Sequence, residues 1–199
     1  MASMDAPIVG TYRTVRFRAG PVDAIASDVD LLIVGMPVLS ATSRIDPGAC
    51  ALDAALSGTL SQLRAGGLFD GRFGETMILS SPPPPVRCRS LMIVGMGEID
   101  DLDAERLGRL AAVAMHAALR LDSCSIACLL RLLDPAATKV AQRAAARAMM
   151  AGVLTALDAY LSPGPTPGRF AGLNWTFDQP DSAADVLGTI IAQWPAAPR

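Results

Sequence analysis

The chain contains one pair of glycines whose spacing suggests phosphate chemistry. Gly95 and Gly97 end a long apolar run, and a helical pattern begins a few residues later. A strand, a Gly-x-Gly turn and a helix N-terminus are the first parts of the fingerprint that binds the pyrophosphate of dinucleotides. Asp100 stands where the third glycine belongs, and further carboxylates crowd the helix start, where they would repel a pyrophosphate. The pattern therefore favours a tight turn with acidic helix capping over dinucleotide binding.

Metal chemistry has little support in the sequence. The acidic residues between Glu98 and Glu105 lack the fixed spacing of a calcium-binding loop, and acids in a first helical turn are favourable without a metal. His116 is the only histidine, whereas catalytic zinc sites commonly use two or three. Helical spacing places it beside Arg109 and Arg120, on the polar side of a helix. We expect a solvated histidine, and neither a metal nor a cofactor.

The cysteines do not have the spacing of a redox or zinc motif. They are Cys50, Cys88, Cys124 and Cys128, and no CxxC pair occurs. The last two lie in an apolar segment that is typical of a buried strand. Because free cysteine is among the most buried residue types, we expect reduced and inert core thiols.

Composition and charge exclude several classes of protein. Apolar residues make up 51% of the 199 residues and the net charge is −2, so the chain is neither disordered nor basic enough to hold nucleic acid or an anionic membrane. No export signal and no run of about 20 apolar residues is present, which predicts a cytoplasmic protein without a membrane span. Lys139, Arg143 and Arg147 form a basic stripe that would suit an acidic partner or phosphates, but a solvated face is the favoured interpretation.

The elements that would position these residues alternate between strand and helix. We expect an edge strand over 12–20, a strand buried on both faces over 30–39, a leucine-striped helix over 51–64 that ends at Gly66 and Gly67, and strands over 75–81 and 89–97. A helix over 102–121 follows, with Leu121 in its apolar stripe. Next come a strand over 124–130 and a helix that starts at Asp134 and Pro135, and then a strand over 173–178 and a closing helix. This order predicts an α/β fold with a mixed sheet in one domain, residues 1–199.

The segment "GGLFDGRFGET" links the leucine-rich helix to the next strand. Its Phe-x-Gly-x-x-Gly-Glu pattern is formed by Phe69, Gly71, Gly74 and Glu75, and the Gly-x-Gly element with its acidic helix start follows in order. Over residues 31–160 this resembles the N-terminal domain of the cytosolic leucyl aminopeptidase family. The resemblance implies a macrodomain-like fold, in which a mixed sheet lies between helices. It also implies that the glycine-rich segment is a structural turn with Phe69, and also Phe73, packed beneath it.

In that family the metal ions and catalytic residues belong to a separate C-terminal domain. Its Asn-Thr-Asp-Ala-Glu-Gly-Arg signature does not occur before the last residue, Arg199. We therefore expect a stand-alone, non-catalytic domain that binds protein, either as a homo-oligomer or on a full-length aminopeptidase. An ADP-ribose or nucleotide binder is the alternative, although Asn174 is the only asparagine, and a metallopeptidase is the least favoured hypothesis.

Any small-molecule cleft should lie outside the carboxyl ends of the strands. The candidate loops there supply Arg44, Asp46, Gly95 and Gly97, with Arg44 as the anion-binding group. For self-association, exposed methionines such as Met149 or Met150 are candidates, although packing in the core would explain them equally well.

Overall fold

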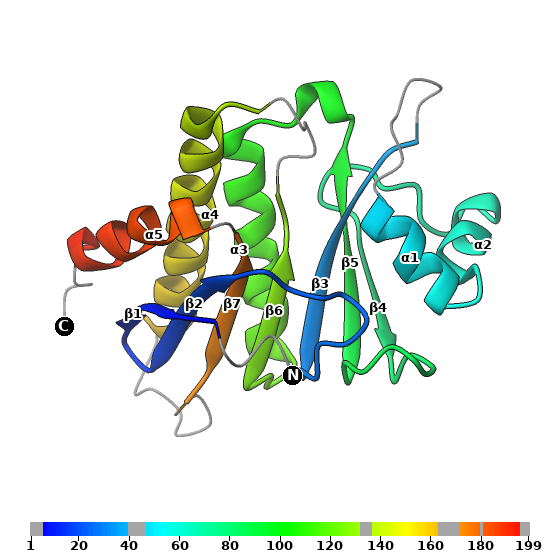
Figure 1. The fold of residues 1–199 in the computed structure, drawn as a ribbon, viewed down its shortest axis with the longest axis horizontal. Coiled ribbons are helices and arrows are strands. Elements are labelled where there is room, and N and C mark those ends of the chain that lie inside the picture. Colours follow the sequence, from blue (N-terminus) through cyan, green and yellow to red (C-terminus); the bar gives the residue numbers. More distant parts are fainter. Residues whose placement is uncertain (1–5, 40–46, 132–136, 163–171, 180, 196–199) are drawn as a thin grey trace.

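The computed structural model describes residues 6–39, 47–131, 137–162, 172–179 and 181–195. Its centre is a seven-stranded mixed sheet with the order β1-β2-β7-β6-β3-β5-β4 (Figure 1). The five inner strands run parallel, and the two outer strands, β1 and β4, are antiparallel to their neighbours. The strands are β1 Ile8–Tyr12, β2 Val15–Gly20, β3 Leu31–Pro37, β4 Thr76–Ser80, β5 Ser90–Gly97, β6 Ser125–Leu129 and β7 Asn174–Asp178.

Helices cover both faces of the sheet, which gives three layers and confirms the macrodomain-like α/β expectation (Figure 1). One face carries α1 Pro47–Ala55 and α2 Thr59–Ala65. The other carries α3 Ala104–Arg120, α4 Lys139–Leu161 and α5 Asp181–Gln193. A short 3₁₀ turn, η2 Ile99–Asp101, connects β5 to α3.

The two faces are packed very differently. The larger core lies between the sheet and α3, α4 and α5, and it contains the biggest fully buried side chains, Trp175, Phe17 and Phe177. There α3 and α4 touch through Gly108 and Gly152, where a Cβ added to Gly152 would lie 2.0 Å from the Gly108 carbonyl oxygen. The smaller core lies under the short helices α1 and α2, and many of the apolar residues packed around it are only partly buried.

Two of the expected elements differ from those in the structure. The strand over 12–20 is not an edge, because β2 lies between β7 and the additional strand β1, and Val15 and Phe17 are fully buried. The single helix over 51–64 is two helices, because the chain turns at Ser57 and Gly58, whose φ angles are +56° and +78°. Pro47 opens α1, a position that suits proline because no backbone N–H is needed there.

The predicted start of α4 was also wrong. The helix begins at Lys139 with Thr138 as its cap, because the Thr138 hydroxyl accepts a hydrogen bond from the Ala141 amide. Asp134 and Pro135 lie outside the described residues. By length and composition α4 is apolar enough to cross a membrane, but half of its most apolar window is buried inside the domain. A core helix of a globular domain meets the same criterion.

The structure also tests the predictions of burial and exposure. Met149 and Met150 are fully buried against the larger core, which agrees with the alternative of core packing and leaves neither available for self-contact. Leu121, which was expected in the apolar stripe of the helix, is instead 44% exposed, and it lies just beyond the end of α3 at Arg120. Among the cysteines expected in the core, Cys88 and Cys128 are buried, but Cys50 and Cys124 are exposed.

Candidate functional site

In the glycine-rich segment, backbone amides bind the carboxylate of Glu75, which belongs to the same segment. Oxygen Oε2 of Glu75 accepts hydrogen bonds from the backbone amides of Asp70, Gly71 and Arg72 at 3.1, 2.8 and 3.0 Å. Successive amides that converge on one oxygen form an anion-binding nest. Gly71 and Gly74 make the loop possible because both have positive φ angles, +81° and +78°. The predicted role of this segment as a structural turn agrees with this geometry.

The same turn covers Gly95 and Gly97. The Gly95 amide donates to the Glu75 carbonyl at 2.7 Å, and the Gly97 amide donates to the Gly71 carbonyl at 2.9 Å. A Cβ added to Gly95 would lie 2.0 Å from the Arg72 carbonyl oxygen, so glycine is required for this close approach. Both glycines are buried, and their amides are already satisfied by backbone carbonyls. A ligand at this loop would therefore need other donors, and the prediction that these glycines contact one stays a prediction.

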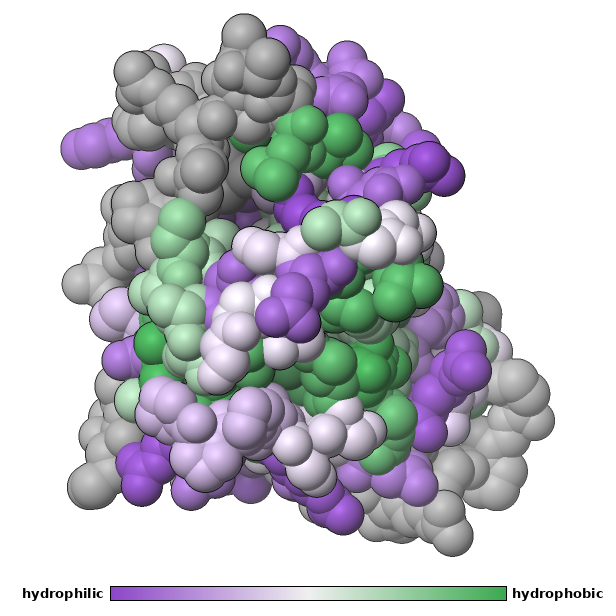
Figure 2. All heavy atoms as spheres, turned by 90° about the vertical axis from the view of Figure 1, so that its right-hand side faces the viewer, coloured by the Kyte–Doolittle hydropathy of each residue, from purple (hydrophilic) through white to green (hydrophobic). Residues whose placement is uncertain are grey.

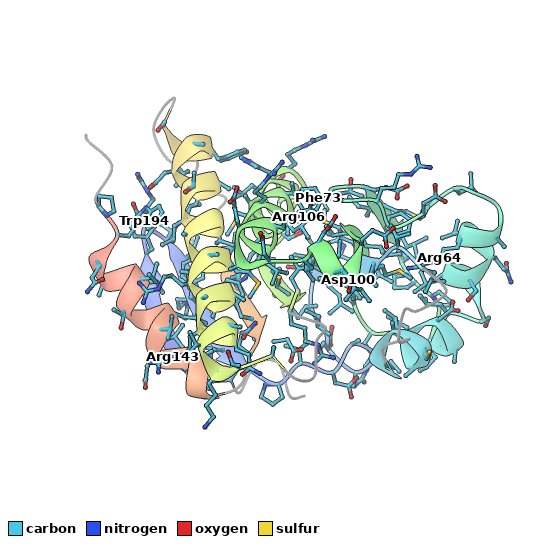
Figure 3. The ribbon with its side chains drawn as sticks, turned by 90° about the horizontal axis from the view of Figure 1, so that it is seen from above. Arg64, Phe73, Asp100, Arg106, Arg143 and Trp194 are labelled. Carbon is cyan, nitrogen blue, oxygen red and sulfur yellow. The ribbon has the colours of Figure 1, made fainter. Side chains whose placement is uncertain are left out.

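The acidic segment after β5 caps a helix, as predicted. The Asp103 carboxylate accepts a hydrogen bond from the Arg106 amide at 2.8 Å, which is the N-cap geometry. The Arg106 side chain lies 3.4 Å from Asp101 and, together with Arg109, stacks on the ring of Phe73, at 5.2 and 5.0 Å from its centroid (Figure 3). Phe73 thus joins the glycine-rich turn to the start of α3.

Other predicted residues are placed as follows. Arg44 and Asp46 lie outside the described residues, so the anion-binding role of Arg44 stays a prediction. His116 is exposed on α3, in agreement with a solvated side chain. The basic stripe of α4 is exposed too, with Arg143 at the rim of the molecule (Figure 3). Within the described ranges, no three His, Cys, Asp or Glu side chains are grouped so that they could hold a metal ion.

Sequence reasoning did not single out Arg64. Its Nη2 donates to the carbonyl of Pro37 at 2.8 Å and so ties α2 to the end of β3. Its Nε and Nη1 are buried, and no partner for them is found among the described residues. Burial lowers the pKa of the Arg64 guanidinium, although the charges of Asp53, Asp70 and Glu75 oppose that shift.

The side of the molecule that carries β4, α1 and α2 exposes apolar side chains. Figure 2 shows a band of hydrophobic residues across this face. Leu68 is 69% exposed and Ile78, in the middle of β4, is 41% exposed, while Met77 and Leu79 are partly buried beside the smaller core. Among the described residues β4 pairs only with β5, so its other edge is open. An open, apolar strand edge is a surface to which another chain can pair.

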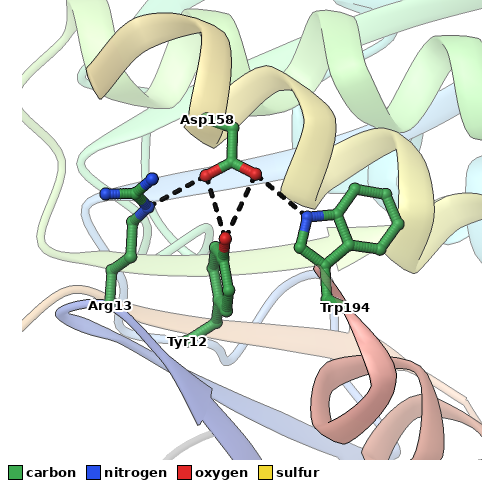
Figure 4. A network of polar contacts seen from close by, with 4 residues as sticks. All are labelled: Tyr12, Arg13, Asp158 and Trp194. Carbon is green, nitrogen blue, oxygen red and sulfur yellow. Dashed lines mark hydrogen bonds and ion pairs between the residues drawn. The ribbon is translucent and has the colours of Figure 1, made fainter. Parts of the chain in front are cut away.

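The opposite end of the sheet is closed by a polar network. The Asp158 carboxylate of α4 accepts hydrogen bonds from the Tyr12 hydroxyl at 3.0 and 3.1 Å, from Nε of Arg13 at 2.9 Å and from Nε1 of Trp194 at 2.9 Å (Figure 4). Burial raises the pKa of Tyr12, and the hydrogen bond and charge of Asp158 add to the shift. The network joins the β1–β2 turn, α4 and the residue that follows α5, which is a structural role.

Solved structures share this fold. A mutant of tomato leucine aminopeptidase matches 94% of this chain with a TM-score of 0.67 at 18% identity, and the match covers 37% of that enzyme's length. The Oceanobacillus iheyensis macrodomain with ADP matches 92% of this chain and 93% of its own, with a TM-score of 0.59 at 13% identity. The Trypanosoma brucei macrodomain in complex with ADP gives 0.59 at 11% identity over 94% of this chain and 75% of its own.

Comparison of the amino-acid sequence with other proteins and with family models identifies the family to which the chain is related. No curated protein matches the chain. The model of the cytosol aminopeptidase family, N-terminal domain, matches residues 38–161, which is more than half of the chain and includes both the glycine-rich turn and the Gly-x-Gly element. This confirms the resemblance seen in the sequence. The chain therefore belongs to the cytosol aminopeptidase family, of which it contains the N-terminal domain.

Proposed function

We propose that this domain acts by binding protein, through the side of the molecule that carries β4. The observation behind the proposal is the open edge of β4, with Ile78 exposed at its centre and an apolar band beside it (Figure 2). Contiguous exposed apolar surface next to an unpaired strand is typical of an interaction site. The partners that fit are a second copy of the chain or a full-length cytosol aminopeptidase.

Nucleotide or ADP-ribose binding is the alternative, because the macrodomains with the same fold are named as complexes with ADP. The described part of the chain gives this alternative less support. The amides of Gly95 and Gly97 are used by the glycine-rich turn, and the anion-binding nest is filled by Glu75. The side-chain amide of Asn174 donates to the Gly172 carbonyl at 2.7 Å. Peptidase activity is not part of the proposal, because the family match is to the N-terminal domain.

One set of measurements separates the two functions. Purified chain would be tested for concentration-dependent mass by sedimentation and for binding to an immobilised full-length cytosol aminopeptidase. In parallel, its melting temperature would be measured with ADP-ribose. A ligand at a hundred times its dissociation constant stabilises a protein by about 2.7 kcal/mol, which is a shift of roughly 5–10 °C for a chain of this size. Association without such a shift supports the proposal, and the shift without association would replace it with the alternative.

A further inference from the structure

The hydrogen bonds around β4 show which of its backbone groups face outward. The Gly95 amide donates to the Glu75 carbonyl at 2.7 Å, and the Ser81 amide donates to the Arg89 carbonyl at 2.8 Å. The register between these two pairs is unbroken. In an antiparallel pair the bonded positions alternate, so every second residue from Glu75 to Ser81 bonds to β5. The residues between them direct their N–H and C=O groups away from the sheet.

Those residues are Thr76, Ile78 and Ser80. All three are exposed, and their side chains lie on the face of the sheet that α3 covers further inward. Met77 and Leu79 lie on the other face, beside the smaller core. Strand β4 contains no charged residue, no proline and no bulge, which are the features that normally prevent an edge from pairing.

We infer that β4 pairs with β4 of a second copy of this chain, antiparallel and about a two-fold axis at Ile78. The inference rests on the proposed function and names its partner. In this register Ile78 faces Ile78 of the second copy, and Thr76 faces its Ser80. All the outward backbone groups are then paired, because each facing pair consists of two outward positions. A two-fold axis at Met77 or at Leu79 would instead leave some of these outward N–H and C=O groups without a partner.

The side chains of β4 support the same register. The strand reads Thr-Met-Ile-Leu-Ser, a sequence that is palindromic in chemistry, with hydroxyl residues at both ends and apolar residues between them. A two-fold axis at Ile78 therefore places Met77 opposite Leu79 and isoleucine opposite isoleucine. Cross-strand apolar pairs of this kind stabilise a sheet, and self-complementarity is what a symmetric interface requires. A peptide of unrelated sequence would need the same order of hydroxyl and apolar residues to match β4. A second copy of the chain has this order because its β4 is identical.

Charge at the two ends of β4 also favours a second copy. At its start lie Glu75 and the exposed ion pair of Asp70 with Arg72, which leaves one net negative charge. Near its end lie the exposed side chains of Arg87 and Arg89. Antiparallel pairing brings the start of one strand beside the end of the other, so opposite charges meet at both ends of the interface. Such complementarity helps to fix the register.

The mass of the chain in solution tests the inference by sedimentation equilibrium. The wild-type chain should show twice its monomer mass. Ile78→Pro removes the outward N–H while leaving the bonds to β5 unchanged, since proline is tolerated where an edge N–H faces solvent. Ile78→Lys places like charges opposite each other. Each variant should raise the dimer dissociation constant at least about tenfold. The matched control is Val140→Lys, at a site on α4 that is 77% exposed, which should leave the constant unchanged.

The distance across the two-fold axis tests the register. A nitroxide label would be attached at Ile78→Cys, in a background in which the exposed Cys50 and Cys124 are serine. Paired strands place the two labelled backbones about 5.5 Å apart, so continuous-wave EPR should report strong dipolar broadening. A label at Val140→Cys in the same background is the control and should show none.

Failure of the inference and failure of the proposed function give different results. If both Ile78 variants are folded and still form the dimer, β4 pairing is overturned while protein binding stays in place. Labels at position 78 that do not interact would have the same consequence. A monomeric wild-type chain that binds full-length aminopeptidase would have the same meaning. A monomer that binds neither itself nor the aminopeptidase would overturn both. Circular dichroism of each variant shows whether it is folded, and Ile78→Lys serves if Ile78→Pro does not fold.

Discussion

The two edges of the sheet are built in opposite ways. At β1 the pairing register shifts between Ile8 and Gly10, which is a bulge, and α5 packs so closely that a Cβ on Gly10 would lie 2.8 Å from the Ile191 side chain. The Asp158 network then fixes the turn that follows β1 (Figure 4). At β4 the register is regular, no described helix covers the strand as α5 covers β1, and Ile78 is exposed.

The difference between the edges shows which one is protected against pairing. Bulges and covering helices are the usual means by which proteins prevent edge-to-edge association. Both are present at β1 and neither is found at β4 among the described residues. Charged side chains and prolines are further means of blocking an edge, and β4 contains neither. The absence of these protective features supports the proposed use of β4 as an interface, and the predictions below test the two edges separately.

The largest effect is expected at the β1 edge, from Asp158→Ala. The substitution leaves three donors, on Tyr12, Arg13 and Trp194, without their acceptor. Hydrogen bonds to a charged group contribute more than neutral ones, but this network is partly exposed, so we expect a loss of about 3 kcal/mol in the free energy of unfolding. That corresponds to a melting temperature lower by roughly 6–12 °C.

Differential scanning calorimetry would measure this loss, with Asp185→Ala as the matched control. Asp185 is an exposed aspartate on α5, and its removal should change stability by no more than about 0.5 kcal/mol. Equal losses in the two variants would show that the network does not hold the β1 edge.

A smaller effect is expected at the β4 edge, from Glu75→Ala. Three backbone amides, of Asp70, Gly71 and Arg72, lose the oxygen that satisfies them, which should cost about 2 kcal/mol. Because the loss is local, amide hydrogen exchange at these three residues should accelerate more than exchange in β1. Glu98→Ala, which removes an exposed carboxylate nearby, is the control. Unchanged exchange at the three amides would contradict the role assigned to Glu75.

Local signals in the sequence predicted local structure well. The helix end at Gly66 was predicted because helix ends need glycine, whereas the structural role of the turn at 69–75 was implied by the family resemblance. Asp103 was among the acids expected to cap α3. These features depend on neighbours within a few residues, so their physical cause is visible in the sequence. The family resemblance added the macrodomain-like arrangement, which no local pattern contains.

Features that depend on distant residues were not predictable in the same way. Strand β7, near the end of the chain, pairs with one side of β2, and β1 pairs with the other side, which makes β2 an inner strand. Strand β1 was missed because Gly10 and Thr11 interrupt its apolar pattern. The sequence left exposure and core packing of Met149 and Met150 as equal alternatives, because α4 is apolar on most sides. Nothing in "TMILS" distinguishes an edge strand from an inner one, so the candidate interface became visible only with the sheet order.

The smallest predicted effect is a pH dependence at the β1 edge, seen with Tyr12→Phe. Near neutral pH the variant should be less stable by about 1 kcal/mol, because the hydrogen bond to Asp158 is lost. In the wild-type chain, burial and then Asp158 raise the pKa of Tyr12 above its ordinary value of 10.0, so the folded state keeps the proton longer than the unfolded state. The stability of the wild type must then fall as pH rises above about 10, where the unfolded tyrosine ionises first.

Phenylalanine has no such proton, so the difference in stability between Tyr12→Phe and the wild type should shrink above pH 10. Burial also raises the pKa of Cys88 to about 11 and that of Cys128 to about 12, but both thiols are present in both proteins and cancel in the difference. Urea unfolding at pH 8 and at pH 11 measures the difference in the free energy of unfolding between Tyr12→Phe and the wild type. At the other edge, β4 contains no ionisable side chain, so Ile78→Thr should differ from the wild type by an amount that does not change with pH. A difference for Tyr12→Phe that is equally constant would show that Tyr12 does not couple the β1 edge to Asp158.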